Sequence, residues 1–117
     1  MVSKATNDMV WDWDLESSSI YRNADQFERI LNLPVEKKDS SKDFWFSRIH
    51  PDDLILLIFF WAELERDAIQ KNFEIEYRFL CGDNKYIYLC DRGYAVRDEQ
   101  DKIIRIIGAT QDINEKK

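Results

Sequence analysis

Histidine, cysteine, proline and glycine are all scarce in this chain. Its 117 residues include one histidine, two cysteines, two prolines and three glycines. A nucleophilic triad needs a base beside its nucleophile, and a metal site needs several converging donors. The single histidine, His50, directly precedes Pro51 at an expected helix start, where an imidazole can cap the backbone. We therefore expect no catalytic residue, no metal site and no haem, and the chain is predicted not to be an enzyme.

The chain also lacks an excess of basic residues and a long hydrophobic run. Its formal net charge is −6, and its Lys and Arg residues are interleaved with acids, which argues against nucleic-acid binding. The longest apolar run, residues 54–62, is far shorter than the roughly 20 residues that span a bilayer. No signal-peptide pattern precedes it. These features predict a cytoplasmic domain without direct membrane contact, whether or not its parent protein is membrane-anchored.

Neither cysteine is placed to form a disulfide. Cys81 and Cys90 flank a predicted turn at residues 82–84. With a two-residue loop they are offset by roughly 13 Å along the strands, and with a three-residue loop they point to opposite faces. Two free thiols are consistent with a reducing compartment.

The second half of the chain is dominated by alternation. Apolar and charged residues alternate over residues 73–80, which is the period-2 pattern of a strand with one wet face. Residues 85–97 and 103–113 are predicted to be two more strands, separated by a charged turn at 98–102.

The register of the first hairpin depends on its loop. A three-residue loop places Ile87 and Leu89 on the same face as Tyr77 and Phe79, whereas a two-residue loop places them among charged side chains. The longer loop is favoured, because a register slip would turn an apolar set toward water. In the last strand, three residues are expected to point inward: Ile104, Ile106 and Thr110.

The first half predicts a hairpin followed by three helices. Residues 10–15 and 19–22 form the hairpin, and a helix capped by Asn23 ends before Pro34. Residues 44–46 form a short helix or turn, and a helix from about 52 to 70 follows. The order β-β-α-α-α-β-β-β predicts an α+β fold, with an antiparallel sheet covered by helices on one face.

Five short motifs follow one another along the chain. They are Trp11-Asp-Trp-Asp-Leu15, Arg48-Ile-His-Pro-Asp-Asp53, Glu76-Tyr-Arg-Phe79, Asp91-Arg-Gly93 and Ile107-Gly-Ala-Thr-Gln-Asp-Ile113. In this order and spacing, over about residues 5–113, the chain resembles a PAS domain with its C-terminal PAC motif. The resemblance implies a five-stranded antiparallel sheet, helices on one face, and a small cavity between the two layers.

The same resemblance implies a sensor or dimerisation module within a larger, often bacterial, signalling protein, such as a two-component sensor histidine kinase. Residues 1–8 would flank the domain at 9–113, and 114–117 would begin the linker to an output domain. It names no ligand or required cofactor, because family members bind many ligands and some bind none. Flavin-binding relatives carry a reactive cysteine that residues 23–34 lack, which argues against their photochemistry.

If a cavity is present, its walls are expected to combine large rings with two hydroxyl groups. The expected ligand-binding residues are Trp13, Phe27, Trp61, Tyr77, Phe79 and Thr110. A ligand there would be small and mostly apolar. In the alternative, the same rings fill a solid core and the domain is a structural dimerisation relay.

The long helix is apolar on more than one face. One stripe is expected to face the sheet: Leu54, Leu57, Ile58, Trp61, Leu64 and Ala68. Four apolar residues lie outside it, namely Ile55, Leu56, Phe59 and Phe60. Either a second subunit or the preceding segment of the same chain should cover them. In the first case the predicted homodimer interface comprises Ile55, Phe59, Phe60 and, on the outer face of the sheet, Tyr88.

Overall fold

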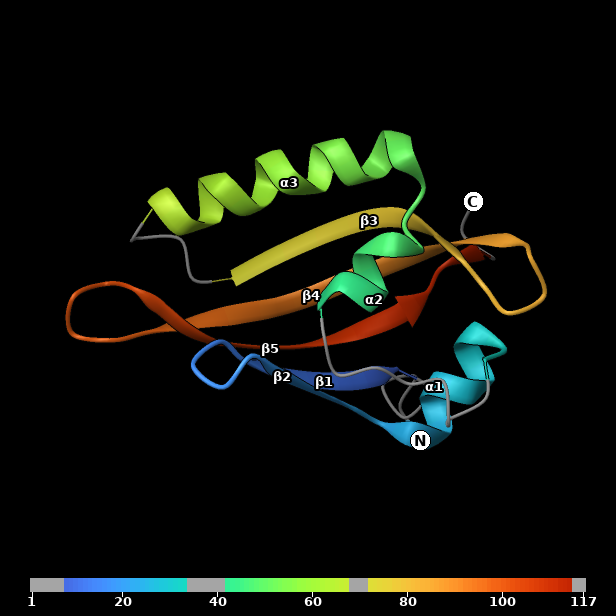
Figure 1. The fold of residues 1–117 in the computed structure, drawn as a ribbon, viewed down its shortest axis with the longest axis horizontal. Helices are drawn as coiled ribbons and strands as arrows, with labels where there is room; N and C mark the ends of the chain where they lie inside the picture. The colour runs from blue at the N-terminus through green and yellow to red at the C-terminus, as the bar shows by residue number, and fades with distance from the viewer. Residues whose placement is uncertain (1–7, 34–41, 68–71, 115–117) are drawn as a thin grey trace, which may run out of the picture.

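The computed structural model describes residues 8–33, 42–67 and 72–114 as five strands and three helices (Figure 1). The strands are β1 (Met9–Asp14), β2 (Ser19–Arg22), β3 (Asn72–Leu80), β4 (Tyr86–Arg97) and β5 (Ile103–Asp112). The helices are α1 (Ala24–Leu31), α2 (Lys42–Ser47) and α3 (Pro51–Arg66). The predicted order of elements is therefore confirmed.

All five strands form one antiparallel sheet in the order β2-β1-β5-β4-β3. The first strand, β1, pairs with the last strand, β5, so sequence-distant ends of the domain meet in the middle of the sheet. The three helices connect one edge strand, β2, to the other, β3 (Figure 1). This is the α+β architecture that the sequence predicts.

The hairpin of β3 and β4 has the register that the apolar alternation favours. Tyr77 pairs with Leu89 and Phe79 pairs with Ile87, so these side chains share one face of the sheet. Tyr77 and Phe79 are buried there. The prediction that this face points toward the helices is therefore correct.

The loop of this hairpin has three residues. The backbone N–H of Cys81 donates to the carbonyl of Lys85 at 2.9 Å, which leaves residues 82–84 as the loop. Asn84 has a φ of 63°, in the left-handed region that asparagine tolerates better than most residues. With this loop Cys81 and Cys90 lie on opposite faces, and both are free, buried thiols.

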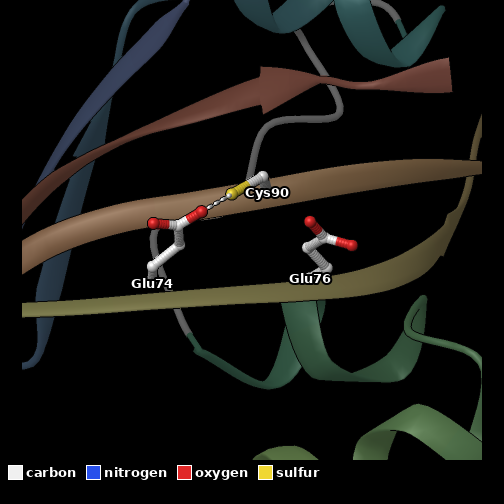
Figure 2. A group of neighbouring side chains, drawn as sticks. All are labelled: Glu74, Glu76 and Cys90. Atoms are coloured by element: carbon white, nitrogen blue, oxygen red, sulfur yellow. Dashed lines mark hydrogen bonds between the residues drawn. The ribbon is translucent and has the colours of Figure 1, made fainter. Parts of the chain in front are cut away.

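Cys90 lies on the outer face of the sheet, between carboxylates of the neighbouring strand. Its thiol hydrogen-bonds to Glu74 with a sulfur–oxygen distance of 3.8 Å, and Glu76 lies beside it (Figure 2). Elsewhere on this face Tyr86 and Tyr88 are exposed. The outward orientation predicted for Tyr88 is thus confirmed.

Two helices begin with caps that the sequence indicates. The Asn23 side chain accepts a hydrogen bond from the backbone N–H of Gln26 at 3.0 Å. His50 Nδ1 accepts one from the backbone N–H of Asp52 at 3.1 Å, directly ahead of Pro51 in the first turn of α3. The structural role expected for the single histidine is confirmed.

The helices pack on the inner face of the sheet and form two adjoining clusters with it. One surrounds Phe27 of α1, Trp45 of α2 and Phe79 of β3. The other joins Leu64 of α3 to Phe73 and Ile106. Helices on one face, as predicted, leave the opposite face of the sheet for solvent or a partner.

The face that α3 turns toward the sheet differs from the predicted stripe. Leu57 and Leu64 are buried as expected, but Ile58 is 56% exposed and Phe60 packs against both core clusters. The predictions for Ile58 and Phe60 were therefore wrong, because Ile58 faces outward and Phe60 faces the core. Ala68, the last residue of the expected stripe, lies outside the described residues.

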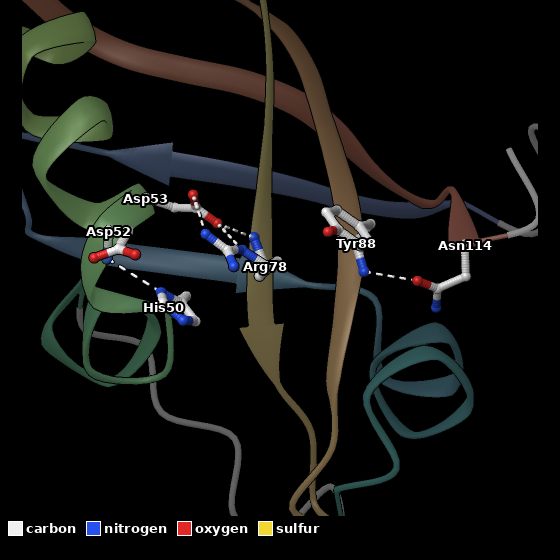
Figure 3. Close-up of polar contacts among 6 residues, drawn as sticks. All are labelled: His50, Asp52, Asp53, Arg78, Tyr88 and Asn114. Carbon is white, nitrogen blue, oxygen red and sulfur yellow. Dashed lines mark hydrogen bonds and ion pairs between the residues drawn. The ribbon is translucent and has the colours of Figure 1, made fainter. Parts of the chain in front are cut away.

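An ion pair between α3 and β3 explains which face of α3 is turned toward the sheet. Asp53, in its first turn, accepts hydrogen bonds from the Arg78 backbone N–H at 2.8 Å and from Arg78 Nε and Nη2 at 2.9 and 3.0 Å (Figure 3). This bidentate contact directs the Asp53 side of the helix toward β3. Leu57, Phe60 and Leu64 follow Asp53 at helical spacing and so face inward.

A β-bulge changes which isoleucine of β5 reaches the core. Val96 pairs with Arg105 but Arg97 pairs with Ile103, so Ile104 is an extra residue in β5. Ile103 is buried and Ile104 is only half-buried. Ile106 and Thr110 point inward as predicted, whereas the prediction for Ile104 was wrong.

Most of the expected flanking segment at 1–8 and linker at 114–117 falls outside the described residues. Among the residues that are described, no helix combines the length and the apolar character that crossing a membrane requires.

Candidate functional site

A small cavity of about 70 Å³ lies between the inner face of the sheet and helices α2 and α3. Large rings dominate its lining, among them Trp11, Trp13, Trp45, Phe60 and Trp61. Trp13 of β1 stacks on Trp61 of α3 with ring centroids 5.3 Å apart. The space is well below the roughly 300–1,000 Å³ of sites for drug-sized ligands. It suits only a very small molecule.

Two glycines bring the rings close to the floor of this cavity. Gly93 and Gly108 face each other on β4 and β5. A Cβ atom at Gly108 would lie 2.8 Å from Cζ2 of Trp11, and one at Gly93 would lie 3.0 Å from Cζ of Phe73. Any larger residue would also approach a backbone carbonyl oxygen of the neighbouring strand to 2.4 Å, that of Arg92 for Gly108 and that of Ile107 for Gly93.

The polar centre of the cavity is the carboxylate of Asp91 on β4. Its Oδ1 accepts a hydrogen bond from the Thr110 hydroxyl at 2.5 Å, and its Oδ2 accepts one from the Tyr77 hydroxyl at 2.7 Å. Each hydroxyl oxygen in turn accepts from an indole N–H: Tyr77 from Trp45 at 2.8 Å, and Thr110 from Trp11 at 3.0 Å. Five side chains from β1, α2, β3, β4 and β5 thus form one chain of hydrogen bonds.

A buried cation completes the site. Arg22 of β2 is 4% exposed and lines the cavity with Asp91. Its guanidinium carbon lies 4.5 Å from the ring centroid of Trp45, a cation–π distance. The positive charge of Arg22 therefore sits against the ring whose N–H supports the Tyr77–Asp91 bond.

This environment shifts two pKa values upward. Burial raises the pKa of Asp91 from 3.8 to about 6, although the bonds from Thr110 and Tyr77 and the charge of Arg22 oppose the shift. Burial and the neighbouring Asp91 charge hold the pKa of Tyr77 well above its usual value of 10.0. Asp91 is thus a carboxyl group that can gain or lose a proton in the physiological range.

Comparison with known proteins identifies this arrangement of sheet, helices and cavity. The family described as PAS fold matches residues 19–110. The chain belongs to the PAS fold family. A search of curated proteins finds no match to it.

Solved structures share the PAS fold at low sequence identity. The N-terminal domain of a diguanylate cyclase with PAS/PAC sensor from Marinobacter aquaeolei is 24% identical, with a TM-score of 0.77 over 93% of this chain and 97% of that one. A sensory box histidine kinase/response regulator from Burkholderia thailandensis is 23% identical, with a TM-score of 0.73 over 94% and 79%. The PAS-B domain of Drosophila melanogaster Cycle with bound ethylene glycol is 20% identical, with a TM-score of 0.65 over 89% and 98%.

The PAS cavity brings together some of the residues that the sequence singles out. Trp13, Trp61 and Thr110 line it. Tyr77 is not part of the lining but reaches it through its hydrogen bond to Asp91. That these four residues bind a ligand stays a prediction.

Phe27 and Phe79 were also expected in the cavity wall, and the structure places them elsewhere. Both are fully buried. Phe27 packs on Phe44, and Phe79 lies 4.2 Å from Trp45 between ring centroids. Neither residue lines the cavity. Phe79 is near the C-terminal end of β3, whereas the lining residues Phe73 and Ile75 are near its N-terminal end.

Sequence reasoning missed both charged residues of the site. Asp91 and Arg22 were not assigned to either face of the predicted sheet. A signal for Asp91 was present, since the three-residue loop that aligns Ile87 and Leu89 also places Asp91 on their face. No comparable signal marks Arg22, because its neighbourhood depends on the pairing of β2 with β1 and of β1 with β5.

The predicted interface residues fall on two surfaces of this PAS domain. Ile55 and Phe59 are 58% and 67% exposed on α3, and Tyr88 is 39% exposed on the outer face of the sheet. Phe60 instead lines the cavity. The segment at 44–46 leaves this side of α3 exposed, and its Trp45 packs in the core instead.

Glu74, Glu76 and Cys90 offer three potential ligand atoms that all lie within 4.8 Å of one another (Figure 2). Glu74 also pairs with Arg92 at 3.5 Å. Burial and the charge of Glu74 raise the pKa of the Cys90 thiol, which favours its protonated form. A thiol hydrogen bond and a cross-strand ion pair explain this group, and we assign no metal to it.

Proposed function

We propose that this PAS domain is the sensory module of a larger bacterial signalling protein, a sensor histidine kinase, and acts in the cytoplasm by binding a small molecule in its cavity. The observation that carries the proposal is that two buried charged residues, Asp91 and Arg22, both line an aromatic cavity. Burying two charges is costly, and a domain that served only as a spacer could fill this volume with apolar side chains. The bound ethylene glycol of the Cycle PAS-B structure supports a ligand of similar size.

Asp91 is connected to the C-terminal end of the domain through one hydrogen bond and the last strand. Thr110, its partner, lies on β5, the last strand. Just beyond that strand, the backbone N–H of Ile113 donates to the Tyr88 carbonyl at 3.1 Å, and the Asn114 side chain accepts from the Tyr88 N–H at 2.8 Å (Figure 3). A ligand that alters the Asp91–Thr110 bond would bias how β5 leads toward an output domain.

The binding proposal predicts that ethylene glycol, used as a neutral probe, shifts the backbone amide resonances of Gly93, Gly108 and Thr110. A filled cavity should abolish this effect, so Ile75→Phe, at a lining position, should lose the shifts. Ile107→Phe, the same change at a position outside the cavity lining, should retain them. Mass spectrometry of molecules released from natively purified protein and an absorbance scan complete the measurement. No shift by the probe and no co-purified molecule would contradict the proposal.

A second candidate is a structural relay that acts by dimerisation. Four apolar side chains, Ile55, Leu56, Ile58 and Phe59, are between 56% and 67% exposed along one side of α3. Adjacent exposed apolar residues of this size are uncommon on monomers and mark interaction surfaces. We propose that a second copy of the chain covers this side of α3, with Tyr88 as a further contact.

Sedimentation should then detect self-association that Phe59→Glu weakens at least tenfold, because a charge would be buried at the centre of the apolar surface. Tyr21→Glu introduces the same charge at an exposed aromatic residue of β2 and should have little effect. A wild-type chain that stays monomeric at high concentration would end the dimer proposal without affecting the sensor proposal.

A further inference from the structure

The Asp91 carboxylate offers the cavity a hydrogen-bond acceptor. In the described part of the chain it accepts two hydrogen bonds, one on each oxygen, from the hydroxyls of Thr110 and Tyr77. A carboxylate has about four acceptor positions. Because Asp91 also lines the cavity, a donor group that enters this space meets a charged acceptor with capacity for a further bond.

Four donor groups around Asp91 are already engaged with acceptors. The hydroxyl hydrogens of Thr110 and Tyr77 are directed to the carboxylate oxygens. The indole N–H groups of Trp11 and Trp45 are directed to the two hydroxyl oxygens. A ligand that only accepts hydrogen bonds would have to displace one of these four donors to join the network. A ligand that donates adds a bond to Asp91 without breaking another.

The walls of the cavity suit a short alkyl group. All four tryptophans of the chain line it, namely Trp11, Trp13, Trp45 and Trp61. Their rings offer a ligand an apolar surface. The volume of about 70 Å³ is roughly half that of the 150 Å³ cavity that holds benzene, so it admits about three or four non-hydrogen atoms.

The two charged residues of the lining favour a neutral ligand. Arg22 and Asp91 both line the cavity, so an ion of either sign would meet a side chain of its own sign. An ion would also lose its hydration among aromatic rings, which is costly. A hydroxyl group avoids both costs. Its hydrogen can be donated to Asp91, and its oxygen can accept from any donor of the lining.

We propose that this cavity binds a neutral alcohol of about three or four non-hydrogen atoms, whose hydroxyl donates to the Asp91 carboxylate and whose alkyl part lies among the indole rings. The inference rests on the proposed sensory function and names the ligand class of the same site. The alcohol would lie beside the bond between Asp91 and Thr110 of β5, the strand that leads out of the domain.

The groups that face Asp91 determine how the alcohol affects its ionisation. β2 supplies Arg22, whose charge opposes the rise that burial causes in the pKa of Asp91. β3 supplies Tyr77, which stays neutral because burial holds its pKa well above the usual value. The groups from β1, β5, α2 and α3 do not titrate: Trp11, Thr110, Trp45, Leu57, Phe60 and Trp61. An ionised carboxyl accepts a hydrogen bond more strongly than a protonated one does, so alcohol binding should lower the pKa of Asp91.

Three probes with the same branched skeleton test the proposal by amide chemical-shift titration at pH 7.5, where Asp91, with a pKa of about 6, is mostly ionised. They are 2-propanol, a neutral donor, acetone, which only accepts, and isopropylammonium, a cation. From the shifts of Gly93, Gly108 and Thr110, 2-propanol should bind about tenfold more tightly than either of the others, because it alone is neutral and can bond the charged acceptor. Saturating 2-propanol should also lower the pKa of Asp91, read from its side-chain carboxyl resonance, whereas acetone should not.

One variant and its matched control locate the effect. Asp91→Asn removes the charged acceptor and should reduce the preference for 2-propanol over acetone to less than about threefold. Asp12→Asn makes the same change in an ion pair with Arg105 that does not line the cavity, and should keep the full preference. Acetone or isopropylammonium binding to wild type as tightly as 2-propanol overturns the inference. If none of the three probes shifts the lining residues, the proposed binding function itself fails.

Discussion

Replacing Phe79 by alanine is expected to reduce the free energy of unfolding by about 3–5 kcal/mol. Phe79 is 0% exposed, and its ring lies 4.2 Å from that of Trp45 between centroids. Truncation removes the transfer free energy of the ring and leaves a cavity between β3 and α2. Because domains of this size have about 5–15 kcal/mol of total stability, this loss would be a large fraction of the total. Urea denaturation followed by tryptophan fluorescence measures the change.

Phe59→Ala is the matched control, since it removes the same side chain from a position that is 67% exposed. At a protein concentration too low for self-association, its effect should stay within about 0.5 kcal/mol. Equal losses in the two variants would contradict the assignment of Phe79 to the core. The comparison also separates folding from dimerisation, because Phe59 belongs to the proposed interface and Phe79 does not.

The sheet could be predicted from the sequence because its signals are local and agree with one another. Alternation over residues 73–80 identifies an inner face, and the apolar residues of the next strand fit it with only one loop length. Asn84, with a φ of 63°, allows that loop. Each of these requirements can be read within a single hairpin, so contacts with the rest of the chain do not change the predicted register.

The orientation of α3 could not be predicted in the same way. Its sequence is apolar on most sides, so several stripes satisfy the helical period and periodicity alone cannot choose among them. The choice between Ile58 and Phe60 is made by Asp53, which binds Arg78 on a strand 25 residues away in sequence. A contact between charged residues that are distant in the sequence produces no periodic pattern from which it could be predicted.

Only the apolar and hydroxyl-bearing residues of the site were predicted from the sequence. Trp13, Trp61 and Thr110 stand out as large or inward-facing residues, but Arg22 and Asp91 were given no role in the site, because most charged residues are exposed. Arg22 and Asp91 line the same cavity although β1 and β5 lie between their strands, because both side chains point inward. Functional sites are where local rules are expected to fail, and these two buried charges are the clearest such failure here.

The raised pKa of Asp91 predicts an unusual pH dependence of stability. Its value of about 6 in the folded state exceeds the ordinary 3.8, so the folded state binds this proton more tightly than the unfolded state. The contribution of Asp91 is therefore fully present below about pH 4 and is lost as the pH rises through 6. Relative to Asp91→Asn, which does not titrate, wild-type stability should fall by about 2 kcal/mol between pH 4.5 and pH 7.5.

Asp53→Asn is the contrasting variant, because the bond from Arg78 lowers the pKa of Asp53. A lowered folded-state pKa gives stability that is present above the unfolded value and lost only as the pH falls through the folded one. That window lies below about pH 4, so the cost of Asp53→Asn should be constant between pH 4.5 and pH 7.5. Urea unfolding of the three proteins at both pH values measures the differences. If the difference between wild type and Asp91→Asn is as constant as that for Asp53→Asn, Asp91 does not titrate in the cavity.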